Sequence, residues 1–144
     1  MKASDVMTKK PIWWCRENSP VREVAKMMAE HDVGAIAACD NEGRLQGIVT
    51  DRDICCRLVA KGGTADMPVS KIMSKDVQCV SGDADMETIE SIMRTKKIRR
   101  VPVVDRSRHL QGFVSLSDIA HHCKSAQEEH AFLQVLTTIC APLH

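Results

Sequence analysis

Apolar and polar residues alternate along this chain with two periods, and the periods follow one another in a fixed order. The segment 21–28 has apolar residues at spacing i, i+3, i+4 and i+7, which predicts one apolar helix face. The apolar run "AIAAC" at 35–39 and the run "LQGIVT" at 45–50 predict two strands, joined by a glycine-containing turn. Ser19 and Pro20 are expected to start the helix, as cap and first helical residue.

The same pattern returns about 65 residues later. A helix is expected from about Asp85, strands at 101–104 and 110–115, and a further helix from Asp118. The strand "LQGFVS" matches "LQGIVT", and the residues that follow them match as well. Each half is therefore expected to be β-α-β-β-α, so the chain contains an internal repeat.

This repeat predicts an α/β (α+β) fold of two pseudo-symmetric β-α-β-β-α units packed sheet to sheet. Neither half is large enough to bury its helices and sheet well alone. The expected division is 1–62 for the first domain, 63–70 for a linker, 71–124 for the second domain and 125–144 for a C-terminal amphipathic helix. That helix either folds back on its own half or contacts another protein, and the sequence leaves both open.

Composition excludes several classes of function. The 144 residues are 44% hydrophobic with a formal charge of +1, so no overall field attracts nucleic acid or a membrane surface. The chain has no run of about 20 apolar residues and no signal-like start, so a cytoplasmic protein is expected. The basic run "RTKKIRR" at 94–100 favours a solvated helix end over a nucleic-acid site, since no basic stripe continues elsewhere.

The seven cysteines favour reduced, small hydrophobic residues in a reducing compartment. No CxxC pair occurs, so a zinc site of the usual spacing is not expected. Adjacent Cys55 and Cys56 are compatible with a thiol-redox site, but two helix-packing thiols are favoured. A metal site at 121–123 ("HHC") is not favoured, because adjacent helix residues point to different sides and cannot easily reach one ion. No metal ligands and no catalytic residues are predicted, and the chain is not expected to be an enzyme.

The candidate chemistry lies where the last strand of each half meets a helix. The pattern Gly-x-x-[Thr/Ser]-x-x-Asp places Thr50 with Asp53 and Ser115 with Asp118. One interpretation is a capping box that satisfies the helix start. The other is a nucleotide site, in which the hydroxyl and free N–H groups hold a phosphate and the carboxylate accepts from ribose hydroxyls.

Two such units, each ending in "GIVTDRDI" or "GFVSLSDI" with "VGAIAACD" or "RVPVVD" upstream, resemble a pair of cystathionine-β-synthase-type (CBS) domains, a Bateman module. The resemblance spans about 5–122. It implies adenosine-containing ligands, such as AMP, ATP, NAD or S-adenosylmethionine, bound in two clefts between the halves. It also implies a homodimer formed through helices that flank the clefts.

The resemblance further implies that each cleft combines residues of both halves. Ser115 and Asp118 would act with Ile12, Trp13, Val33 and Gly34, and Thr50 and Asp53 with Val77, Cys79, Ile98 and Arg99.

The two halves differ in charge at one matched position. Arg99 and Arg100 stand where the first half has Gly34 and Ala35. Guanidinium groups favour phosphate, so the Thr50/Asp53 cleft is expected to prefer a charged nucleotide. Trp13 with its neighbour Trp14 offers the other cleft an aromatic surface for a base.

The sequence thus predicts a regulatory module that senses an adenine nucleotide and signals to an unknown effector by a conformational change. No cofactor is expected to be required. A nucleotide-hydrolysing or thiol-redox enzyme, and a structural dimer with empty clefts, remain the alternatives.

Overall fold

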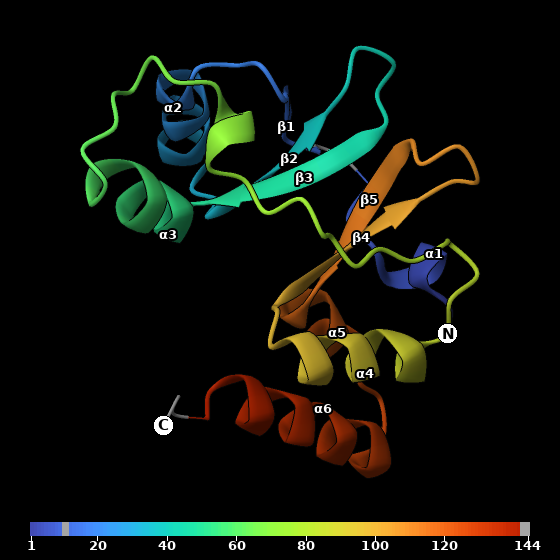
Figure 1. Ribbon diagram of the computed structural model, residues 1–144. Helices are drawn as coiled ribbons and strands as arrows, with labels where there is room; N and C mark the ends of the chain where they lie inside the picture. Colours follow the sequence, from blue (N-terminus) through green and yellow to red (C-terminus); the bar gives the residue numbers. More distant parts are fainter. Residues whose placement is uncertain (10–11, 142–144) are drawn as a thin grey trace. The chain divides into compact units, whose positions relative to one another are not determined.

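The computed structural model of the chain describes residues 1–9 and 12–141 (Figure 1). Its residues form two compact units. The first-repeat unit comprises Trp13–Val77, and the second-repeat unit comprises Met1–Ile12 together with Gln78–His144.

This division differs from the expected domains at both ends of the first repeat. The N-terminal segment belongs to the second-repeat unit, because Ala3 N donates to Ala84 O at 2.8 Å and Thr8 N donates to Phe113 O at 2.8 Å. The expected linker 63–70 belongs to the first-repeat unit. The first repeat is therefore completed by the segment that follows it in the chain. The second repeat is completed by the N-terminal segment.

The first-repeat unit contains a three-stranded sheet and four helical segments within its described residues. Strand β1 (Trp14–Arg16) pairs in parallel with β2 (Ala35–Cys39), which pairs antiparallel with β3 (Leu45–Thr50). The other elements are α2 (Val21–His31), α3 (Asp51–Asp53), the π-helical turn η1 (Ile54–Val59) and the 3₁₀ turn η2 (Val69–Lys71). The predicted strand ranges are confirmed here.

The start of α2 differs from the prediction. Pro20 occupies the cap position rather than the first helical position, and neither Ser19 nor another side chain caps the helix. Instead Val21 N donates to Met67 O at 2.9 Å and Arg22 N donates to Ala65 O at 3.0 Å. Backbone carbonyls of the expected linker thus satisfy the free N–H groups of the helix, and this explains why the linker folds with the first repeat.

The second-repeat unit contains a two-stranded sheet and four helices within its described residues. Strands β4 (Arg100–Val104) and β5 (Leu110–Ser115) are antiparallel. The helices are α1 (Ala3–Val6), α4 (Met86–Lys96), α5 (Leu116–His122) and α6 (Ala126–Ile139).

The first strand expected in this repeat is reduced to one bridge, between Val80 and Val103. Val80 N donates to Pro102 O at 3.0 Å, and Val104 N donates to Val80 O at 2.9 Å. The next bond of a parallel ladder would need a donor at Pro102, which has no N–H. The prediction of a full strand here was wrong for that reason.

Each unit has its own hydrophobic core. In the first-repeat unit the fully buried side chains include Val21, Val24, Ile36, Val49 and Ile72. In the second-repeat unit they include Ile89, Met93, Val101, Val103, Val114 and Val135. The mixed α+β class with tandem repeats and a C-terminal helix is confirmed.

Helix α6 folds back on its own unit, beside α4 in Figure 1. Val135 is fully buried, and Phe132 and Ile139 pack against the same core. Ser125 Oγ accepts from Glu128 N at 3.1 Å, so the predicted cap is formed. The end of the predicted range, 142–144, lies outside the described residues. No helix among the described residues is long and apolar enough to cross a bilayer.

Candidate functional site

The glycine of each motif lets another chain segment approach the last strand. A Cβ on Gly47 would lie 2.7 Å from Ser74 O, and a Cβ on Gly112 would lie 2.5 Å from Thr8 O. At these positions Ile48 pairs with Ser74, and Phe113 pairs with Thr8. The segments at 8 and 74 thus occupy matched places beside β5 and β3, directly before the motif hydroxyl and carboxylate.

The first motif forms a capping box at the start of α3. Thr50 N donates to Asp53 Oδ2 at 2.9 Å, and Asp53 N donates to Thr50 Oγ1 at 3.1 Å. Within the described part of the chain, the hydroxyl proton of Thr50 is not donated to any acceptor. The site therefore keeps one hydroxyl donor that can reach a phosphate or another acceptor.

Arg57 adds a positive charge to this motif. Its Nε lies 3.6 Å from Asp53 Oδ1, one helical turn away, and its Nη1 donates to Ile72 O at 3.1 Å. The Asp53 side chain is only 13% exposed, whereas that of Arg57 is 52% exposed. The guanidinium thus joins the motif carboxylate to the backbone of the segment that leads to Val77. Arg57 has no counterpart in the second repeat, where His122 stands at the matched position, so the repeated motif does not indicate it.

The second motif has the same box with more bonds. Ser115 N and Ser115 Oγ both donate to Asp118 Oδ2, at 2.8 and 2.9 Å, and Asp118 N donates to Ser115 Oγ at 3.1 Å. Thr8 Oγ1 also donates to Asp118, at 3.2 Å to Oδ1 and 3.4 Å to Oδ2. Thr8 was not among the predicted residues of this site. The match of "DVMTKK" with "KIMSKD" was the available signal, since both segments carry a hydroxyl residue before their repeat.

The two motifs therefore differ in the hydrogen-bonding groups that remain available to a ligand. Asp118 already accepts hydrogen bonds from two side-chain hydroxyls, one of which is the hydroxyl of Ser115. The Thr50 hydroxyl donates no hydrogen bond among the described residues, and Asp53 lies beside the guanidinium of Arg57. Both capping boxes are real, so the structural interpretation of the motif holds whatever else the residues bind.

The free N–H groups expected at the helix starts are mostly occupied. Asp51 N donates to Gly34 O at 3.0 Å, and Leu116 N donates to Arg99 O at 3.0 Å. Arg52 N donates to Asp51 Oδ1 at 2.8 Å. A phosphate at these helix starts would therefore depend on side-chain donors more than on the backbone.

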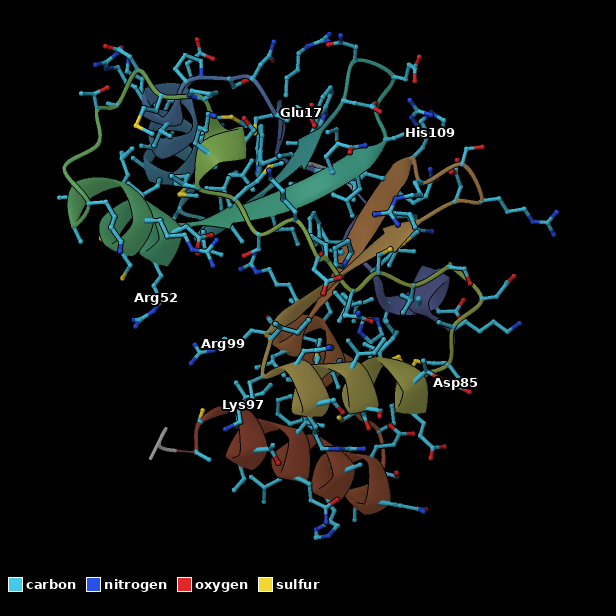
Figure 2. All side chains as sticks on the ribbon, in the orientation of Figure 1. Glu17, Arg52, Asp85, Lys97, Arg99 and His109 are labelled. Atoms are coloured by element: carbon cyan, nitrogen blue, oxygen red, sulfur yellow. The ribbon has the colours of Figure 1, made fainter. Side chains whose placement is uncertain are left out.

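Arg99 and Arg100 lie in the second-repeat unit at the start of β4. Arg100 is the strand partner of Ser115, and both arginines are exposed. Figure 2 shows the side chain of Arg99 extending away from the ribbon. Besides the motif residues Ser115 and Asp118, their unit contains three further predicted ligand residues, all half-buried: Ile12, Cys79 and Ile98. Cys79 accepts a long contact, 3.9 Å, from Arg108 Nη1.

Trp13, Val33, Gly34 and Val77 lie in the first-repeat unit with Thr50 and Asp53. Gly34 is next to the first motif, since its carbonyl accepts from Asp51 and Ala35 pairs with Thr50. The clefts expected from the family resemblance join residues of different units, so their composition stays a prediction.

The described residues contain no group of three or more His, Cys, Asp and Glu side chains that could hold a metal ion. In the "HHC" run, His121 Nδ1 lies 2.7 Å from Ser117 O and His122 Nδ1 lies 2.8 Å from Asp118 O. Cys123 Sγ donates to Ile119 O at 3.2 Å. Each of the three side chains is thus engaged with the preceding turn of α5.

Comparison with known proteins gives two matches to one family model. The model of the CBS domain matches residues 3–60 and 69–125. Hypoxic response protein 1 of Mycobacterium tuberculosis is 34% identical over 128 residues, which cover 88% of this chain and 86% of that protein. The CBS domain-containing protein YhcV of Bacillus subtilis is 38% identical over 103 residues, 72% of each chain.

Solved structures agree with these matches. A crystal structure of Hypoxic Response Protein I with two coordinated zinc ions has a TM-score of 0.78 at 30% identity, covering 86% of this chain and all of that one. The CBS domain pair of protein MJ0100, in complex with 5′-methylthioadenosine and S-adenosyl-L-methionine, has a TM-score of 0.75 at 27% identity. This similarity covers 84% of this chain and 94% of the MJ0100 chain.

Proposed function

The chain belongs to the CBS-domain family as a tandem pair, and on that premise we propose that it is a regulatory module that binds an adenosine-containing ligand. The ligand class comprises AMP, ADP, ATP, NAD and S-adenosylmethionine. The module would bind its ligand without consuming it.

The observation that carries this proposal is the doubled cap motif. Each copy presents a hydroxyl and a carboxylate side by side at the start of a helix, Thr50 with Asp53 and Ser115 with Asp118. A carboxylate can accept from the two hydroxyls of a ribose, and a hydroxyl can donate to a phosphate. The MJ0100 domain pair, which binds two adenosine derivatives, supports the same ligand class for this chain.

The charges near the two motifs support different preferences. Arg57 and the free hydroxyl proton of Thr50 favour an anionic group at the first motif. The second motif has a carboxylate that Thr8 and Ser115 already satisfy. We expect the first motif to take the more highly charged ligand, in agreement with the role given to Arg99 and Arg100 from the sequence.

The test is a calorimetric titration of the protein with AMP, ATP, NAD and S-adenosylmethionine, followed by chromatography of the mixture. GMP and ribose 5-phosphate serve as controls for the base. Saturable heat with an adenine compound and unchanged ligand after the titration supports the proposal. Absence of binding by all four compounds would leave a structural dimer as the better account, and steady conversion of ligand would establish an enzyme.

A regulatory module must transmit the effect of ligand binding to a partner. The proposed partners are a second copy of the chain, in a homodimer, and an unidentified effector protein. Helix η1 has an apolar exposed surface at Val59, which is 67% exposed, next to exposed Cys55 and Cys56. Burial of such a surface in a second copy would be favourable. Light scattering across a concentration series tests the dimer. Hydrogen exchange with and without ligand tests whether binding changes the protection of other elements.

A further inference from the structure

Helix α6 extends the fold beyond the part of the chain that matches the family model. The second match ends at residue 125, and α6 comprises Ala126–Ile139. Phe132, Val135 and Ile139 form its inner side and contribute to the core of the second-repeat unit. Leu133 lies about 100° further around the helix than Phe132, and it is 56% exposed. The added helix thus completes a core on one side and presents an apolar side chain on another.

Leu133 lines an open groove between α6 and α4. The groove has a volume of about 440 Å³ and is lined by Arg94 of α4 and by Leu133, Gln134, Thr137 and Thr138 of α6. The two helices lie side by side and run in the same direction (Figure 1). They form a helical layer that lies entirely within the second-repeat unit.

Charges on this layer are separated along its length. Glu87 and Arg94 lie on the same side of α4, about two turns apart. Glu128 and Glu129 lie in the first turn of α6, and the basic run 94–100 begins in the last turn of α4. The layer is therefore acidic where both helices begin and basic where α4 ends. We call the surface formed by Glu87 and the groove residues the α4–α6 face.

The charges of the layer are not paired within the unit. No salt bridge among the described residues involves Glu87, Arg94 or Glu129. Burial raises the pKa of the Glu90 carboxyl, and Arg94 opposes this shift. The carboxylates of Glu87 and Glu128 raise the same pKa further. Like charges thus repel one another at the acidic end, where a cation from a partner would be favourable.

We propose that the α4–α6 face binds the same face of a second copy of the chain, with the helices of the two copies antiparallel. A two-fold axis brings residue i of one copy to residue j of the other, and the reverse. An axis near the middle of α4 brings Glu87 of each copy opposite Arg94 of the other. It also brings the acidic end of each layer opposite the basic end of the other.

The charge pattern favours this partner and this direction. A parallel arrangement of two copies would bring like charges together, which opposes association. A partner with charges of one sign would leave one end of the face unmatched. Burial of Leu133 supplies the apolar contribution. The face is separate from the exposed residues of η1, which belong to the first-repeat unit, and the inference does not depend on the proposed ligand.

The test measures self-association of the ligand-free protein by sedimentation velocity over a concentration series. A Val59→Ser background makes the exposed surface of η1 more polar, so that the α4–α6 face is measured alone. Arg94→Glu and Glu87→Arg each bring like charges together in a homodimer. Leu133→Ser removes the apolar contact, and Arg106→Glu reverses an exposed charge in the turn between β4 and β5 as the control.

Two further samples separate the charge pairing from a general effect of charge. An equimolar mixture of the Arg94→Glu and Glu87→Arg proteins forms a heterodimer in which both pairs have opposite charges. The double variant restores opposite charges in a homodimer. Circular dichroism confirms that each variant is folded, since all the changed side chains except Arg94 are exposed and Arg94 is half-buried.

We expect the background protein to be a dimer, and each of Arg94→Glu, Glu87→Arg and Leu133→Ser to weaken self-association at least about tenfold. The mixture and the double variant should recover the background affinity to within about threefold, and Arg106→Glu should leave it unchanged. No recovery in either sample, or an equal effect of Arg106→Glu, would overturn the antiparallel pairing. A background protein that stays monomeric at every concentration would overturn the interface itself, and a different partner would then have to cover this face.

Discussion

Thr8 and Asp118 are 110 residues apart in the sequence, yet the Thr8 hydroxyl donates to both carboxylate oxygens of Asp118, at 3.2 and 3.4 Å. The bond ties the start of the chain to the second cap motif. It also means that Asp118 already accepts one hydroxyl of the kind that a ribose would offer.

Replacing Thr8 by valine, which keeps the side-chain shape, should remove this bond. We expect the free energy of unfolding to fall by about 0.5–1.5 kcal/mol, the usual net value of a hydrogen bond, measured by urea denaturation followed by circular dichroism. Thr8→Ser retains the hydroxyl and should lie close to wild type. Equal stability of the valine and serine variants would show that the bond contributes nothing.

Gly112→Ala tests the close approach of the N-terminal segment. The new Cβ would meet Thr8 O at 2.5 Å, and that backbone atom cannot move away without breaking the pairing with Phe113. Overpacking of this kind costs about 1–3 kcal/mol of stability. Gly82→Ala is the matched control, because its Cβ would lie 3.4 Å from Ser4 Cβ, an ordinary contact. If both variants have the same urea midpoint, the segment at 8 does not pack on β5 as described.

These segments also mark the limit of what the sequence could predict. The strands at 35–39 and 45–50 follow from local apolar patterns, and the structure has them at those residues. The cap of α2 by Met67 O and the bond from Thr8 to Asp118 join residues that are distant in the sequence. Local sequence patterns carry no information about such contacts. The lost strand at Val80 was predictable in principle, since Pro102 cannot donate to a parallel partner.

For the candidate site, the motif residues were predictable because hydroxyl and carboxylate are three residues apart on one helix start. Arg57 was not, because its bond to Ile72 O requires the fold of the following segment. The stacking of His31 on Trp13 was missed for the same reason. Which residues share a cleft depends on how the two repeats assemble, and a pattern within one repeat carries no information about that.

The cysteines should differ sharply in reactivity. Burial raises the pKa of the Cys15 thiol from 9.0 to about 12, and burial raises that of Cys39 to about 11. Both remain protonated at pH 8, whereas Cys55, Cys56 and Cys140 are exposed. Mass spectrometry after iodoacetamide treatment should find adducts on the three exposed residues in the native protein and on Cys15 and Cys39 only in urea. Labelling of Cys15 in the native protein would contradict the buried placement.

The same two thiols predict an alkaline loss of stability. Their folded pKa values lie above the unfolded value of 9.0, so the unfolded chain loses these protons first. The free energy of unfolding should be independent of these groups below about pH 9 and should fall as the pH rises toward 11 and 12. Urea denaturation at pH 8, 9 and 10 measures this. A Cys15→Ala, Cys39→Ala double variant should show a smaller fall over the same range.

The arginines of the second repeat should separate charged from neutral ligands. Arg99→Ala with Arg100→Ala should weaken ATP binding more than tenfold and leave adenosine binding nearly unchanged, since a charge-assisted contact contributes about 1.5–3 kcal/mol. The loss should shrink with added salt where the phosphates are exposed. Arg106→Ala with Lys124→Ala removes the same net charge from exposed positions and serves as the control.

Assignment of these arginines to a cleft needs the Asp53→Ala and Asp118→Ala backgrounds. The cleft arrangement expected from the family places the arginines with Thr50 and Asp53, so their effect should persist in the Asp118→Ala background and disappear in the Asp53→Ala background. The reverse result would mean that Arg100 serves its own strand partner, Ser115. The residues that bind the phosphate would then all belong to one repeat.

The central claim is that the two motif carboxylates bind ligand in addition to capping their helices, and calorimetry on Asp53→Ala, Asp118→Ala and the double variant with AMP tests it most directly. Loss of a cap costs about 0.5–2 kcal/mol of stability, so all three proteins should stay folded by circular dichroism. Each single variant should lose AMP binding at its own motif, or weaken it at least about tenfold, and the double variant should show no saturable heat. A folded double variant that binds AMP with wild-type affinity and stoichiometry would contradict the claim and leave the motifs as helix caps alone.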